Sequence, residues 1–307
     1  EQLNKNTDTA ISVFKEFWRY CLPFIPYAWL GFVHTFADRW MLQHWGGSSE
    51  QAYYAIAQQF SAVALLATTS ILRIFWKEIA EAEHQGDREK VKRLYLKVSK
   101  GLYFVSVVVM GGLLPWVDEI ILLLLGPAYI GGAFTLMLML LYPVHQSMGQ
   151  IGGTMLYATE NTRLQVLLGL AFMVTSIVVV YFILAPNTMA VPGLGLASQG
   201  LAIKMIVMQL IQVNIMAWFI ARIFAWKFDW AYQIIMLGTA VMAGLIAKLV
   251  VVNALSLHVL VLMVLSGLLY MLMMIVFAVM KPSLIGLEKH ELSYYIKIVS
   301  SILRIRR

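Results

Sequence analysis

Long apolar segments recur along the chain and are separated by short polar stretches. Each segment has at least the roughly twenty residues that a helix needs to cross a bilayer core of about 30 Å. The pattern therefore predicts an all-α, polytopic integral membrane protein with about eight transmembrane helices. The expected spans are roughly residues 20–45, 53–76, 101–125, 132–157, 164–186, 196–221, 232–252 and 258–280.

Composition agrees with this class. Hydrophobic residues make up 61% of the 307 residues, and charged residues make up only 13%. A soluble domain carries about 25% charged residues. No soluble core buries eight such segments, so lipid must solvate their outer faces, and membrane lipids are the first predicted partner.

Basic residues are confined to alternate connections. Residues 45–52, 126–131, 187–195 and 253–257 contain no Lys or Arg, whereas the other connections and both ends are basic. The positive-inside rule then predicts that both ends are cytoplasmic. The net charge of +7 lies mainly in these juxtamembrane segments, where it meets anionic lipid heads, so we expect no nucleic-acid partner.

Polar residues form a stripe on the first expected helix. Tyr27, His34 and Asp38 share one face, and Arg39 lies beside it. A charge near the middle of a span costs about 2.5–3.5 kcal/mol on insertion scales, so this stripe must face protein or water. One interpretation is a cavity wall at which Arg39 binds an anion and Asp38 or His34 carries a proton. The other is a structural ion pair with a neighbouring helix.

Three further basic residues fall within spans. Lys204 lies about eight residues into its span, roughly 12 Å at 1.5 Å per residue, which is deep for a side chain that reaches the interface. Gln212 follows two turns later on the same face, and together they predict a cavity. Arg73 and Lys248 lie nearer their span ends and are expected to reach the interface.

Several glutamines also lie within the spans. Their amides suit hydrogen bonds to sugar hydroxyls, and they equally suit hydrogen bonds between helices. Gly149 and Gly153 have the G-x-x-x-G spacing that lets two helix backbones approach closely. The glutamines in question are Gln58, Gln59, Gln146, Gln150 and Gln209.

Signatures of catalysis are missing from the sequence. It contains no phosphate-binding loop, zinc-protease motif, nucleophile elbow or dinucleotide fingerprint, and its single cysteine, Cys21, excludes a disulfide within the chain. We therefore predict no enzyme activity, catalytic residue, metal or cofactor. Glu50, Asp118 and Glu119 are the carboxylates near the outer connections that an alternative, a multispan glycosyl- or acyltransferase, would use.

Three stretches resemble a known family. They are LPFIPYAWLGFVHTFADRWML with AYYAIAQQFSAVALL, the LLLLG-x-x-Y segment at 122–129, and GLASQGLAIKM. In order and spacing, these stretches look like the second half of polysaccharide and O-antigen flippases. Those proteins belong to the multidrug/oligosaccharidyl-lipid/polysaccharide exporter superfamily.

The resemblance implies two six-helix bundles around a central cavity, of which this chain holds the second. We then expect a cytoplasmic linker at 1–16, the second bundle at 17–222, two additional helices at 223–280 and a basic amphipathic tail at 281–307. The first, N-terminal six-helix bundle is missing. Because the chain begins with Glu1, we expect that residue 1 is not the natural start.

The resemblance also implies a function, which is the flipping of a polyprenyl-pyrophosphate-linked oligosaccharide across the cytoplasmic membrane of a bacterium for cell-surface polysaccharide synthesis. Guanidinium binds phosphate oxygens in a bidentate fork. A cation-coupled multidrug exporter of the same superfamily is the alternative, and it would favour acidic cavity residues. The expected substrate contacts are Arg39, Lys204, Gln58 and Gln212, and the expected ion-coupling residues are Asp38 and His34.

Overall fold

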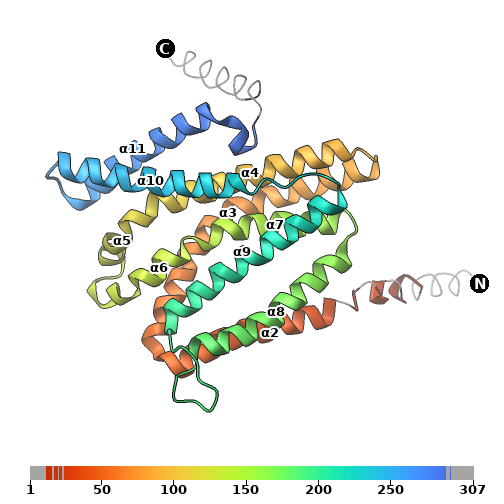
Figure 1. Cartoon of the computed structure of the whole chain (residues 1–307), viewed down its shortest axis with the longest axis horizontal. Coiled ribbons are helices and arrows are strands. Elements are labelled where there is room, and N and C mark those ends of the chain that lie inside the picture. Colours follow the sequence, from red (N-terminus) through yellow and green to blue (C-terminus); the bar gives the residue numbers. More distant parts are fainter. Residues whose placement is uncertain (1–11, 16, 20, 23, 288–290, 292–307) are drawn as a thin grey trace, which may run out of the picture.

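The computed structural model describes residues 12–15, 17–19, 21–22, 24–287 and 291, and every regular element in these residues is a helix (Figure 1). The predicted all-α class is thereby confirmed. The long helices are α2 (Phe24–Met41), α3 (Gly47–His84), α4 (Arg88–Leu113), α7 (Tyr142–Ala158), α8 (Thr162–Leu184), α9 (Ala197–Ile223), α10 (Ala231–Ala254) and α11 (Val259–Met280). The short elements are η1 (Leu42–Gly46), η2 (Leu114–Trp116), α5 (Val117–Leu124), η3 (Pro127–Gly132), α6 (Ala133–Met139) and η4 (Pro282–Ile285).

Among the described residues, six helical stretches are long and apolar enough to cross a membrane, so this is a multi-pass membrane protein. A bent pair, Ile25–Leu66 with Ile71–His84, raises the number to seven when it counts as one span. The sequence predicted about eight spans, and the difference lies at the start of the chain, where the predicted spans at 20–45 and 53–76 both fall within this bent pair. The six stretches are Arg88–Leu124, Pro127–Ala158, Thr162–Leu184, Ala197–Ile223, Ala231–Ala254 and Val259–Met280.

A π-helical turn, η1, joins α2 to α3 and redirects the chain. Figure 1 shows α2 running down to this corner and α3 leaving it in another direction, back toward the end of the bundle from which α2 came. Gly47 follows the turn with φ 83°, a backbone conformation that residues with a side chain rarely adopt. The glycine therefore permits the change of direction, and α2 and α3 diverge from it.

The helices form successive layers. In Figure 1, α10 and α11 lie along one side, α3, α4, α7 and α9 fill the middle, and α2 and α8 lie on the opposite side. α2 packs against α8, α8 against α9, and α10 against both α4 and α11. In α11, only 17% of the most apolar 18-residue stretch is buried inside the protein, so the remaining apolar side chains need lipid as their solvent.

The predicted ends fall almost entirely outside the described residues. In the linker at 1–16 only 12–15 are described, and in the tail at 281–307 only 281–287 and 291 are. The amphipathic character of that tail, the cytoplasmic position of both ends and the domain limits at 17–222 and 223–280 stay predictions.

Candidate functional site

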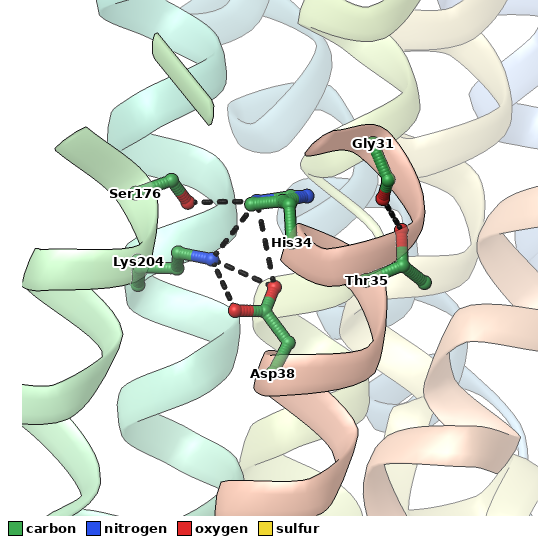
Figure 2. A network of polar contacts seen from close by, with 6 residues as sticks. All are labelled: Gly31, His34, Thr35, Asp38, Ser176 and Lys204. Carbon is green, nitrogen blue, oxygen red and sulfur yellow. Dashed lines mark hydrogen bonds and ion pairs between the residues drawn. The ribbon is translucent and has the colours of Figure 1, made fainter. Parts of the chain in front are cut away.

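Three helices bring a buried polar network together (Figure 2). His34 and Asp38 are four residues apart on α2 and therefore share a face. Lys204 comes from α9, and its Nζ lies 2.7 Å from both carboxylate oxygens of Asp38. The same Nζ is 3.4 Å from Nε2 of His34, and that nitrogen is 2.8 Å from Oγ of Ser176 on α8. The network thus ties α2, α8 and α9 to one another.

This ion pair is almost completely removed from solvent. Lys204 is 2% exposed and Asp38 is 5% exposed. Taking two charges out of water is costly, and their mutual attraction offsets that cost only with good geometry. The bidentate contact between one ammonium and both carboxylate oxygens supplies that geometry. Removing either partner alone leaves an uncompensated buried charge, which typically costs about 3–5 kcal/mol.

Lys204 was expected in a cavity with Gln212, as a substrate contact, and that role stays a prediction. In the structure its ammonium group is enclosed by Asp38 and His34. The physical reason is that a buried ammonium group is stable only beside a counter-ion. The expected coupling residues, Asp38 and His34, do lie together, with 3.8 Å between His34 Nε2 and Asp38 Oδ2.

Arg39 and Gln58 also meet. The Arg39 guanidinium donates a hydrogen bond of 2.5 Å to Oε1 of Gln58 on α3, which links the two diverging helices α2 and α3. Arg39 itself is exposed. A guanidinium carries five N–H donors, and this bond uses one of them. Two of the predicted substrate contacts therefore form one exposed polar pair.

An uncharged polar cavity of about 430 Å³ opens between five helices. Five glutamines line it, and none of its lining residues carries a charge. Of the predicted substrate contacts, Gln212 lies in its wall, whereas Arg39, Gln58 and Lys204 do not. The polar lining is Gln146, Gln150, Thr154 and Tyr157 from α7, Gln165 from α8, Gln209 and Gln212 from α9, Tyr27 from α2 and Tyr142 at the start of α7. We call this space the amide cavity.

Glycines on α7 bring two of these glutamines close. A methyl group at Gly149 would lie 2.8 Å from Nε2 of Gln209, and one at Gly153 would lie 3.2 Å from Nε2 of Gln165. Gly149 faces side chains of α9 and Gly153 faces the side chain of Gln165 on α8, so the two glycines lie against different helices. The space that they leave is filled by side chains, and the predicted close approach of two helix backbones at this pair is not seen.

A second, smaller cavity of about 130 Å³ lies beside the amide cavity. It is lined by His34 and Ser176, which belong to the polar network. It also shares Tyr142, Gln209 and Gln212 with the amide cavity. Asp38 and Lys204 line neither cavity, so His34 is the member of the network that connects the ion pair to this space.

Two members of these sites on α8 were not predicted from the sequence. Gln165 lies one turn into α8, and Ser176 lies further along the same apolar helix. The available signal was an isolated polar side chain at each position of an otherwise apolar segment. Gln59, named among the candidates, is instead exposed on α3 and does not line the amide cavity.

Two of the three carboxylates that a transferase would use, Glu50 and Glu119, are engaged in structural contacts, whereas Asp118 is exposed. Glu50 accepts hydrogen bonds from the backbone N–H and the hydroxyl of Ser198, at the start of α9. Glu119 forms an ion pair of 2.5 Å with Lys248, which was expected to reach the interface and which also lies over the ring of Trp116. Both acids therefore hold helix ends in place.

Comparisons with known proteins find the fold but no sequence family. No family model and no curated protein matches the chain. Among solved structures, the chain is similar to one described as lipid II flippase MurJ in an inward closed conformation, with a TM-score of 0.66 and 15% sequence identity. The match covers 90% of this chain and 56% of the flippase chain. The protein therefore has the fold of part of a lipid-linked substrate flippase.

Proposed function

We propose that the protein flips a polyprenyl-pyrophosphate-linked oligosaccharide across the membrane for cell-surface polysaccharide synthesis. One observation carries the proposal, which is that this fold encloses a buried Asp38–Lys204 ion pair, whose neighbour His34 lines a small cavity beside an uncharged polar one. Buried charges in a membrane protein are costly and characteristically serve transport. The flippase fold supports a lipid-linked cargo.

Arg39 and Gln58 are the proposed contacts for the phosphate end of this cargo. Arg39 is exposed, and its free N–H groups suit the oxygens of a pyrophosphate. Gln58 orients the guanidinium through their hydrogen bond. Gln212 is the proposed contact for the sugar end, because it lines the amide cavity.

Asp38, His34 and Lys204 form the proposed coupling device. A proton delivered to Asp38 through His34 would remove the charge that holds Lys204, and the freed ammonium would then attract the phosphate. Loss of the ion pair would also loosen α2 from α8 and α9, since the network ties these three helices together. A proton thereby favours one arrangement of the helices over another, as population shift requires.

A second six-helix bundle is the proposed partner of this chain. The chain covers 56% of the flippase chain it resembles, and rocking of one bundle against another would give alternating access. We also propose the cytoplasmic membrane of a bacterium as the location, with both ends of the chain in the cytoplasm. The protein acts as a transporter in this proposal, without enzyme activity or a cofactor.

The alternatives fit the described residues less well. A cation-coupled multidrug exporter would favour acidic residues in its cavity, and the amide cavity has none in its lining. A transferase would use a carboxylate near the outer connections; Glu50 and Glu119 are engaged by Ser198 and Lys248, which leaves Asp118 as its one exposed candidate among the three.

Deletion of the gene tests the proposal. We expect the surface glycan to disappear and the lipid-linked oligosaccharide to accumulate in the inner leaflet. Return of the wild-type gene restores both, and return of Arg39→Ala at equal protein level does not. Unchanged surface glycan and lipid-linked intermediate after deletion would overturn the flippase assignment.

A further inference from the structure

We propose that the amide cavity binds a neutral, polyhydroxylated sugar unit and excludes the phosphate part of the cargo. This inference rests on the proposed function for the origin of the sugar, and it adds the chemistry that the cavity recognises. It separates two parts of one substrate, with the sugar in the amide cavity and the phosphates elsewhere.

The lining favours hydroxyl groups over charges. Each glutamine side chain offers an acceptor oxygen and a donor NH₂ group, which match neighbouring hydroxyls that donate and accept in turn. Five such amides converge on the cavity from α7, α8 and α9. No Lys or Arg stands in its wall to compensate a phosphate, so an anion there would lose its hydration without gaining a counter-ion.

Two buried glutamine oxygens require a ligand that offers hydrogen-bond donors. Oε1 of Gln150 and Oε1 of Gln165 are buried and accept no hydrogen bond from the described residues. Both residues line the amide cavity. Buried acceptors without partners are unfavourable, so the ligand has to bring donors to them. Sugar hydroxyls and acetamido N–H groups are donors, whereas a fully ionised phosphate can only accept.

The size and the remaining walls also fit a sugar. The volume of about 430 Å³ falls within the range of about 300–1,000 Å³ that small-molecule sites occupy. Tyr27, Tyr142 and Tyr157 contribute aromatic rings together with hydroxyl groups. Sugar rings have one polar edge and apolar C–H faces, and this mixture of amides and rings offers a surface for each.

The bound sugar would share wall residues with the coupling network. Tyr142, Gln209 and Gln212 belong to both cavities, and His34 and Ser176 also line the smaller cavity. A sugar in the amide cavity would therefore contact side chains that also line the space at His34.

Binding of a soluble neutral sugar tests the inference without requiring transport. The full chain is placed in phosphatidylcholine nanodiscs, and saturation-transfer NMR is recorded with N,N′-diacetylchitobiose, a neutral disaccharide that carries both kinds of donor. We expect saturation transfer to the wild type and a loss of about tenfold in affinity for the Gln150→Met, Gln165→Met double variant, since two hydrogen bonds are removed. Inorganic pyrophosphate is expected not to compete.

Matched variants keep the result interpretable. Gln59→Met removes an exposed amide outside the cavity and is expected to bind as the wild type does. If the double variant does not fold, Gln212→Met is used instead, because Gln212 is a half-buried residue of the cavity wall. A loss of sugar affinity in Gln212→Met also supports the inference. Absence of saturation transfer in the wild type, equal affinity in the cavity variants and Gln59→Met, or competition by pyrophosphate would overturn it.

The outcome is separable from that of the proposed function. If sugar binding depends on Gln150 and Gln165 but deletion of the gene leaves surface glycan unchanged, the cavity assignment is supported and the flippase assignment is overturned. If glycan export depends on the gene but no sugar binds in the amide cavity, the flippase assignment is supported and the cavity assignment is overturned.

Discussion

Lys204 Nζ lies 2.7 Å from both carboxylate oxygens of Asp38, and this contact joins residues 166 positions apart in the chain. The pair connects α9 to α2 inside the membrane-spanning bundle and is closed to solvent. Its position beside His34 makes it both a structural tie and the proposed point of coupling.

Asp38→Asn tests the structural contribution of this pair. The substitution leaves the Lys204 ammonium buried without a counter-ion, and we expect the protein to lose about 3–5 kcal/mol of stability. Thermal unfolding in detergent measures the loss. The double variant Asp38→Asn, Lys204→Met removes both charges and should recover most of it. If the single and double variants unfold at the same temperature, the ion pair is not the source of the effect.

Replacement of His34 separates coupling from stability. His34→Gln keeps a polar side chain toward Ser176 but removes the imidazole, which is the proposed proton carrier. We expect flipping in inside-out membrane vesicles to vary between pH 6 and pH 8 for the wild type and to become nearly independent of pH in the variant. Ser176→Ala is the control, because it removes the hydrogen bond to His34 and keeps the imidazole. A wild-type pH profile retained in His34→Gln excludes this residue from proton transfer.

Substitutions of Arg39 test whether glycan export depends on the positive charge or on the planar shape of its guanidinium. Arg39→Lys keeps the positive charge and loses the planar fork, so we expect a decrease of about tenfold in glycan export, with little change in unfolding temperature. Arg39→Ala should reduce export further, and Gln58→Ala should give a milder loss because it only frees the guanidinium. If Arg39→Lys exports as much glycan as the wild type, then export requires only the positive charge at this position and not the planar guanidinium.

The same substitution, glycine to alanine, is expected to have opposite effects on stability at two positions of α10. A methyl group at Gly244 would overlap the backbone carbonyl of Gly111 on α4, so Gly244→Ala should cost about 1–3 kcal/mol by forcing α10 away from α4. Gly238 has no such neighbour within 4 Å, and Gly238→Ala should be neutral or stabilising by up to about 1 kcal/mol. Thermal unfolding of the two variants compares them directly. Equal stability would mean that α4 and α10 do not approach as closely as described.

The candidate site was only partly predictable from sequence. The polar stripe on α2 identified His34, Asp38 and Arg39, because an amphipathic pattern within an apolar helix is local information. Their partners were not predictable, since neighbouring helices are chosen by packing across the whole bundle. Asp38 and Arg39 are adjacent in sequence, yet Asp38 pairs with Lys204 and Arg39 with Gln58. The pairing of Lys204 with Asp38 was not predictable for the same reason.

The sequence by itself determined the helical, multi-pass class of this protein, because a backbone in hydrocarbon must satisfy its hydrogen bonds internally and twenty apolar residues form a helix that does so. Tertiary structure alone decided which polar groups meet. Gln150 on α7, Gln165 on α8 and Gln209 on α9 are each compatible with hydrogen bonds between helices, and only the packing of these three helices brings them to one cavity. Helix formation depends on residues a turn apart, whereas a cavity depends on side chains from segments that only the folded bundle brings together.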